Sequence, residues 1–328
     1  MNSIGRSKFI IVSILFSLAG IAIFISMQLG AVYISPPTLF SFLQGKISEP
    51  NINLLVNLRT ARVLSAFLSG CILSLSGLLY QTVFQNPLVD AYVLGVASGA
   101  VFGGMLSMRL GIMNPWPGAF AGAVMATTLT LILGKQNGGL SIIKTLLGGV
   151  VVGSVLSAAS TFLLITWKGP LYGGIFWHLG NFANASRRGL IELGVVSFVF
   201  LLTFILFHRS LDILLLGEEE AASLGLRVGK FRLIVLVLSA LAVSYISSRF
   251  GLLGFVGLIA PHVARLLVGP LHNLLLPTAF LFGGILLVSS ETIARSVFAP
   301  VEIPVGIITV LLGGPFFLYL LGRRVGGK

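Results

Sequence analysis

The run FIIVSILFSLAGIAIFISM, residues 9–27, decides the class of fold. It contains no charged side chain, and a helix needs about 20 mainly apolar residues to cross the roughly 30 Å hydrocarbon layer of a bilayer. The run is longer than the core of a signal peptide, which has about 7–15 residues, and residues 30–37 contain no small-x-small cleavage site. We therefore expect a retained first membrane span.

Similar apolar runs fill the rest of the chain. Of its 328 residues, 56% are hydrophobic and 9% are charged, against about 25% charged in soluble domains. Charges, prolines and glycines divide the chain into ten runs, near residues 9–30, 61–80, 91–108, 117–134, 142–166, 190–207, 231–248, 252–269, 276–294 and 305–322. Lipid offers no partner to backbone groups, and the strict alternation of a barrel strand is absent. The prediction is an all-α integral membrane protein with ten transmembrane helices in a single domain, residues 1–328.

The basic residues follow the ends of the apolar runs. The formal net charge is +12, but without a basic patch this charge indicates membrane topology and not nucleic-acid binding. A cytoplasmic N-terminus places the larger share of Lys and Arg inside, so we expect both termini in the cytoplasm. The bias is modest, and some arginines on the outer side therefore need another reason. Cys71 is the only cysteine, which excludes an intrachain disulfide.

No pattern in the sequence indicates an enzyme. Paired intramembrane carboxylates, a zinc signature and a credible Ser–His pairing are all missing. Gly229 and Lys230 are followed by Phe231 and lack the upstream glycine of a phosphate loop, so ATP hydrolysis is not predicted for this chain. His262 has no second His or Cys at ligand spacing, and beside Pro261 it is interpreted as a structural residue at a helix kink. We expect no catalytic residue, metal site or bound cofactor.

The hydrophilic stretch LGEEEAASLGL, residues 216–226, lies between the sixth and seventh runs. It predicts a short cytoplasmic helix, because Glu218, Glu219 and Glu220 fall in the first turn, where the helix dipole favours negative charge. Gly225 is a suitable C-terminal stop. Taken alone, the stretch is also consistent with a merely solvated loop helix.

Eight short motifs are distributed along nearly the whole chain. They are RTAR (59–62), GLLYQ (77–81), FQNPL (84–88), LGV (94–96), LGEEEA (216–221), GFVGLIAPH (254–262) with Arg265, EIPVG (302–306) and GGPFF (313–317). Together they resemble the FecCD family of ABC importer permeases, which serves siderophores, haem and vitamin B12.

The resemblance implies a type II ABC importer permease with ten helices per subunit in the inner (cytoplasmic) membrane. Two subunits, here two copies of this chain, would enclose the pathway. The implied partners are two ATP-binding cassette subunits, which hold the ATP and Mg²⁺, and a periplasmic or lipid-anchored substrate-binding protein.

The resemblance also assigns roles to residues. Segment 216–226 corresponds to the coupling helix that docks into the ATPase, and the residues that carry this role are Leu216, Gly217, Glu218, Glu219, Glu220, Ala221, Leu224 and Gly225. Arg59, Arg62 and Arg295 correspond to the outer arginines that receive acidic residues of the binding protein. Arginine suits such pairing because it binds carboxylates in a bidentate manner. The alternative is that these arginines reach lipid phosphates.

The family's pathway lies largely along spans five and ten and the short helix after span five. Its cytoplasmic gate corresponds to Ser141, Ile142 and Ile143, and the two isoleucines predict a hydrophobic constriction that gates by dewetting. The outer segment 171–182 carries aromatics and His178. It is interpreted first as an interfacial aromatic belt, with contact to a chelate as the alternative.

Ferric siderophore is the first expectation for the substrate, from the family's breadth. Haem, a cobamide and an oxyanion such as molybdate or tungstate stay open. The rival class is an ion-coupled secondary transporter, which normally buries ionisable groups within its spans. The nearest such groups here are Glu192, Glu291 and Glu302, all near predicted outer boundaries.

Overall fold

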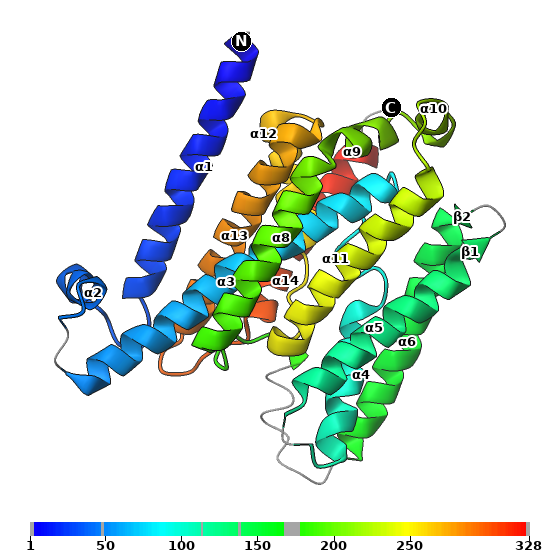
Figure 1. Ribbon diagram of the computed structural model, residues 1–328. Coiled ribbons are helices and arrows are strands. Elements are labelled where there is room, and N and C mark those ends of the chain that lie inside the picture. The colour runs from blue at the N-terminus through cyan, green and yellow to red at the C-terminus, as the bar shows by residue number, and fades with distance from the viewer. Residues whose placement is uncertain (1–2, 47–48, 113, 137–138, 167–177, 326–328) are drawn as a thin grey trace.

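The computed structural model describes residues 3–46, 49–112, 114–136, 139–166 and 178–325, and long helices form the body of the molecule (Figure 1). The long helices are α1 (Ser3–Gln28), α3 (Pro50–Val83), α5 (Trp116–Gly134), α6 (Ile142–Ile165), α8 (Arg187–Leu206), α11 (Val228–Phe250), α13 (His272–Ser296) and α14 (Val305–Val325). The shorter helices are α2 (Pro36–Leu43), α4 (Val96–Arg109), α9 (His208–Leu214), α10 (Glu218–Ser223) and α12 (Val256–Val268).

A helix is present in each of the ten predicted runs. Among the described residues, seven helices are long and apolar enough to cross a membrane: α1, α3, α5, α6, α8, α11 and α13. The runs 91–108 and 252–269 hold shorter helices, α4 with 14 residues and α12 with 13. The helical membrane class is therefore confirmed, with long apolar helices accompanied by shorter ones.

Irregular backbone explains why α4 and α12 are short. After α3 the chain passes through residues 84–94. Gly95, in the left-handed region at φ 74°, then directly precedes α4. Likewise Gly251 has φ 76° and Phe255 has φ 65° between α11 and α12. Such breaks are tolerated at membrane depth only where protein covers the freed backbone groups.

The second run begins earlier than predicted. The apolar pattern placed its start near residue 61, whereas α3 begins at Pro50 and has 34 residues. Its first turns carry Asn51 and Asn53, and the hydropathy pattern therefore missed them. Arg59 and Arg62 consequently lie inside the helix and not at its first turn.

A small β-ribbon accompanies the helices without changing the all-helical class of the fold. Strand β1 (Lys135–Gln136) pairs antiparallel with β2 (Gly139–Leu140) between α5 and α6. Ser141 follows directly, and its Oγ accepts a hydrogen bond from Lys144 N as the N-cap of α6. The ribbon therefore sets the starting point of α6.

Helix α3 is the centre of the packing. It contacts α13, α12, α8 and α11, and most of its length is buried. Gly70 packs against the backbone of Gly283 on α13, and Gly77 packs against the backbone of Gly257 on α12, so closely that neither position has room for a Cβ. Small residues allow this approach where lipid gives helices no hydrophobic reason to associate.

A second group of helices, α4, α5 and α6, packs beside α11 (Figure 1). Gly99 and Gly103 on α4 meet Gly122 and Gly118 on α5 in the same close manner. By contrast, α1 and α6 turn large apolar side chains outward, among them Phe16, Val151 and Val155. These faces suit contact with lipid or with another apolar surface.

The contact between Gly77 and Gly257 generates a prediction about stability. We expect Gly77→Ala to lower the stability of the folded protein by about 1–3 kcal/mol, because the added methyl group meets backbone that cannot move aside. The control is Gly20→Ala on α1, where a Cβ has open space around it. Thermal unfolding of the purified protein in detergent measures both, and equal midpoints for the two variants would contradict the role of the contact.

Candidate functional site

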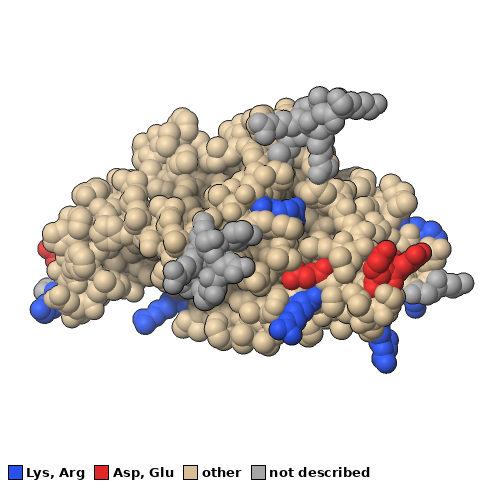
Figure 2. All heavy atoms as spheres, turned by 90° about the horizontal axis from the view of Figure 1, so that it is seen from above, with Lys and Arg blue, Asp and Glu red and all other residues tan. Residues whose placement is uncertain are grey.

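The molecule has two ends with different polar chemistry. The start of α1, the end of α14, the β-ribbon and α10 lie at one end in Figure 1, which we call the α10 end. Helix α2 and the start of α3 lie at the other, which we call the α2 end. Figure 2 looks onto the α10 end, where acidic and basic side chains lie next to one another over part of an otherwise tan surface.

The acidic stretch forms the predicted helix, although a shorter one. Helix α10 covers Glu218–Ser223, with Gly217 before it at φ 116°. Gly225 follows at φ 86°, the left-handed conformation of a helix stop, as predicted. Leu216 and Leu224 flank the helix and are exposed, whereas Ala221 is buried.

One of the three glutamates is engaged within the chain. Glu218 Oε2 accepts a hydrogen bond of 2.7 Å from Arg232 Nη1, and the Arg232 side chain on α11 is almost wholly buried. Glu219 and Glu220 are exposed. Glu218 therefore ties α10 to α11.

A hollow of about 550 Å³ adjoins α10. The end of α3 and the turn after it line one side with Gln81, Gln85 and Pro87, while α12 contributes His262 and Arg265. The chain just before α10, at Leu215 to Gly217, closes the third side. Residues of the FQNPL and APH motifs thus line the same hollow as the chain just before α10. The His262 ring also contacts Phe316 edge to face.

Helix α9, which leads into α10, is joined to α3 and α13 by a chain of three side chains. Asp212 Oδ1 accepts hydrogen bonds of 2.8 Å from both the backbone N and the Nδ1 of His272. The Nε2 of the same ring lies 2.9 Å from Thr82 Oγ1. No local pattern of the sequence indicates this arrangement, because its members are separated by 60 to 190 residues.

The three predicted arginines come together at the α2 end, around Glu291. Arg62 Nε binds Glu291 Oε1 at 2.5 Å, and Arg295 binds both oxygens of Glu291 at 2.9 and 3.1 Å. Arg62 Nη1 also binds Glu302 Oε1 at 2.9 Å. The Glu291 side chain is wholly buried, whereas 36% of the Glu302 side chain is exposed.

The remaining donors of these arginines bind the end of α1 and the segment after it. Arg59 donates to the carbonyls of Met27, Gln28 and Val32, at 2.8 to 3.2 Å. Arg295 donates to the carbonyls of Ser26 and Leu29, at 3.0 and 2.9 Å. Arg59 and Arg295 are thus buried and hydrogen-bonded within the chain, and their role in docking a binding protein stays a prediction.

The predicted gate residues lie directly after the β-ribbon. Ser141 is the N-cap of α6 and Ile142 and Ile143 form its first turn. Ile142 packs against the main core, while Ile143 is 70% exposed. Only Ile143 is therefore placed to meet another molecule, and its role as a gate stays a prediction.

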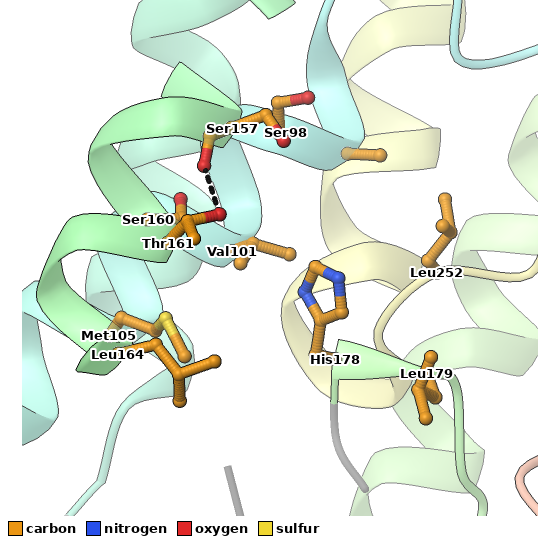
Figure 3. A pocket seen from close by; sticks show the side chains of 11 residues that line it. Ser98, Val101, Met105, Ser157, Ser160, Thr161, Leu164, His178, Leu179 and Leu252 are labelled. Carbon is orange, nitrogen blue, oxygen red and sulfur yellow. Dashed lines mark hydrogen bonds between the residues drawn. The ribbon is translucent and has the colours of Figure 1, made fainter. Parts of the chain in front are cut away.

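A second hollow, of about 260 Å³, lies between α4, α6 and His178 (Figure 3). Hydroxyls of Ser157, Ser160 and Thr161 on α6 and Ser98 on α4 line it together with the His178 ring. His178 Nδ1 is buried and has no hydrogen-bond partner in the described structure. The rest of the predicted outer segment up to Trp177 lies outside the described residues.

Asp90 is a further polar residue that the sequence analysis missed. Its carboxylate accepts hydrogen bonds from the backbone of Ala91, at 2.7 Å, and of Phe255, beside the start of α12. The carboxylate therefore stabilises the break between α11 and α12. Its position in the run VDAYVLG, between two spans, gave no sign of this contact.

The comparisons with known proteins agree with this geometry. A sequence model described as the FecCD transport family matches residues 18–323. The chain belongs to this family. It is therefore the non-catalytic, multi-pass transmembrane permease subunit of an ABC importer complex of the haem, vitamin B12 and siderophore type.

Curated members of the FecCD family resemble this chain along most of its length. The "Hemin transport system permease protein HmuU" of Yersinia pestis is 34% identical over 308 residues, which cover 91% of each chain. The "Cobalamin import system permease protein BtuC" of Halobacterium salinarum is 36% identical over 271 residues, 81% of this chain and 73% of that protein.

Solved structures show the same fold. A metal-chelate type ABC transporter in an inward-facing conformation superposes with a TM-score of 0.83 at 29% identity, covering 97% of this chain and 100% of that one. PsaBC of Streptococcus pneumoniae gives a TM-score of 0.60 at 21% identity over 86% of this chain and 94% of that one. The fold is thus that of an ABC importer permease for metal chelates.

The burial of Glu291 gives a prediction about folding. We expect Glu291→Gln to reduce the stability of the protein by about 3–5 kcal/mol, because Arg62 and Arg295 then lose a shared counterion inside the protein. The control is Glu192→Gln, which removes a partly exposed partner of Arg249 and Arg188. The two are compared by the yield of monodisperse protein and by thermal unfolding. A yield and melting temperature like those of the control would contradict a buried structural counterion.

Proposed function

We propose that this FecCD permease carries a metal chelate, a ferric siderophore first among the candidates, from an extracytoplasmic binding protein into the cytoplasm. In this proposal each subunit crosses the membrane with ten helices. Helix α10 and both termini lie in the cytoplasm, and the α2 end lies outside. The observation that carries the proposal is α10, a short exposed acidic helix that is held firmly to the body of the permease through Glu218 and Arg232.

The ATPase fits the α10 end. Exposed Leu216 and Leu224 offer apolar contacts on either side of Glu219 and Glu220, which suit basic groups of a partner. The neighbouring hollow has room for a side chain of that partner. Helix α9 precedes α10 and is hydrogen-bonded to α13, which is in turn hydrogen-bonded to α3, so a displaced α10 carries these helices with it as a rigid body.

A second copy of the chain supplies the other half of the pathway. Exposed apolar side chains on α6 and α14, such as Val151, Val155 and Leu311, suit burial against an identical subunit. Ile143 would then face its counterpart across the axis and form the hydrophobic constriction. The polar hollow near His178 would contact the chelate, whose oxygen atoms can pair with hydroxyls and an imidazole.

The binding protein docks at the α2 end through exchange of a carboxylate. Arg59 and Arg295 have their donors engaged, so only the pair of Arg62 and Glu302 is accessible to a partner. A carboxylate of the binding protein replaces Glu302 on Arg62, while Glu291 stays paired with Arg62 and Arg295 inside the protein. Charge reversal at Arg59 or Arg295 would mainly unfold the protein and does not test docking.

The importer assignment predicts uptake that depends on a partner's ATP hydrolysis. With the neighbouring ATPase and binding protein reconstituted in liposomes, radiolabelled ferric siderophore should accumulate when ATP is supplied. Substitution of the phosphate-loop lysine in the ATPase should abolish accumulation, since this chain has no phosphate loop of its own. Uptake driven by an ion gradient without ATP would instead support the secondary-transporter class. ATP-driven uptake of haem, a cobamide or molybdate instead of the siderophore would contradict the proposed substrate but not the importer class.

The accessible pair generates a prediction about docking. We expect Glu302→Gln to tighten binding of the binding protein by about three- to tenfold, because Arg62 no longer has a competing carboxylate within the chain. The control is Glu49→Gln, which makes the same change of charge at the α2 end on an exposed side chain that has no ion pair in the described structure. Surface plasmon resonance on permease in nanodiscs measures both affinities. Weaker or unchanged binding by the first variant would exclude the exchange.

A further inference from the structure

Helices α3 and α13 run antiparallel and stay in one register across the whole bundle. Arg62 pairs with Glu291 at the α2 end, and Thr82 pairs with His272 at the α10 end. Twenty residues separate the two α3 positions, about 30 Å at 1.5 Å per residue. This length equals the hydrocarbon thickness of a bilayer. A polar contact therefore fixes the pair at each membrane surface.

Between these two contacts the helices touch through their backbones. Gly70 and Gly283 leave no room for a Cβ on either side. Ser74 Oγ donates a hydrogen bond of 2.7 Å to the carbonyl of Ala279, one turn further along each helix. Neither helix can slide or rotate against the other without breaking this bond or forcing backbone atoms together.

The contact at the α10 end also includes the segment that precedes α10. The His272 ring lies within hydrogen-bond distance of Asp212 Oδ1 through Nδ1, at 2.8 Å, and of Thr82 Oγ1 through Nε2, at 2.9 Å, which links α9, α13 and α3 in series. The backbone N–H of His272 donates to the same carboxylate, so Asp212 also satisfies a free donor at the start of α13. Gln85 adds a bond of 3.2 Å to the Leu214 carbonyl.

We propose that the α3–α13 pair is the strut through which the docking end and the ATPase end of this permease affect one another, with Asp212, His272 and Thr82 as its joint to α9 and α10. The inference rests on the proposed function. Displacement of α10 moves Asp212 on α9, and the hydrogen bonds of the joint then move α13 and α3. Because α3 and α13 keep their register, Arg62 and Glu302 at the α2 end move with them. The side chains of the joint are positioning residues for transport.

Variants of the joint test the proposal in the reconstituted transporter. We expect Thr82→Val and His272→Ala to lower the stimulation of ATP hydrolysis by loaded binding protein, and the substrate moved per ATP, by about tenfold. Thr82→Ser keeps the hydroxyl and should retain wild-type coupling. The matched control is Thr278→Val on α13, a buried threonine whose hydroxyl bonds its own helix at Leu274 O and no other helix among the described residues. Co-purification with the ATPase shows that each variant still assembles.

The native Cys71 offers a second test, of the strut itself. A Cβ at residue 284 on α13 would lie 2.7 Å from Cys71 Sγ on α3, so Gly284→Cys brings two sulfurs within bonding range once the Phe67 ring turns aside. Because the pair moves as one body, the oxidised variant should keep its uptake. Gly284→Ser controls for the substitution, and the double variant with Cys71→Ser controls for the oxidant.

The outcomes separate the strut from the importer assignment. Wild-type protein without ATP-driven uptake would defeat the proposed function. Wild-type uptake with unchanged coupling in Thr82→Val and His272→Ala would overturn the joint. Loss of uptake on oxidation of Gly284→Cys, with recovery on reduction, would overturn the rigid strut, because it would mean that α3 and α13 must slide during transport.

Discussion

The rest of the structure depends on the direct backbone contact between α3 and its neighbours. In lipid an apolar side chain gains little by leaving the hydrocarbon for another apolar surface, so helices associate through close packing and internal polar bonds. Gly70 and Gly77 bring α3 onto α13 and α12 at distances that no larger residue permits. This approach in turn holds Ser74, Thr82 and Arg62 against their partners, and it leaves α3 almost without contact to lipid.

The two ends of the molecule differ in which charges are exposed and which are paired. At the α10 end, one buried arginine holds one exposed carboxylate, which leaves most of the negative charge of α10 on the surface. At the α2 end, three arginines share two carboxylates and several main-chain carbonyls, and only Glu302 is substantially exposed. A membrane protein can present charge at its surface in this way only where the inner part of each cluster is already satisfied.

Hydropathy alone predicted the membrane class and the place of a helix in every run, because a span must be apolar wherever it lies in the chain. Hydropathy did not predict the helix boundaries where contacts with distant residues stabilise a segment that is polar or irregular by itself. The polar first turns of α3 precede its apolar stretch, and the break before α12 is contacted by Asp90 from a distant part of the chain. The motif resemblance supplied the family, which the comparisons confirm. The roles of the arginines, α10 and the gate stay predictions.

Part of the arginine cluster was readable in advance. Glu291 and Arg295 are four residues apart on one predicted helix, a spacing that favours an ion pair. That pairing would have indicated that Arg295 is not a free surface cation. The contacts of Arg62 with Glu291 and Glu302 span 229 and 240 residues, and no local pattern in a single sequence reports them. The same holds for the joint of Asp212, His272 and Thr82.

The attachment of α1 has a consequence for biogenesis. This helix is little buried, and its end is held by hydrogen bonds from Arg59 and Arg295 to carbonyls of residues 26–32. The donor at residue 295 is made by the ribosome 266 residues after the acceptor at residue 29. The first helix to enter the membrane can thus be held early by Arg59, but it is fully fastened only when α13 has been made. A nascent chain that stops before α13 leaves the carbonyls of Ser26 and Leu29 without their Arg295 donor.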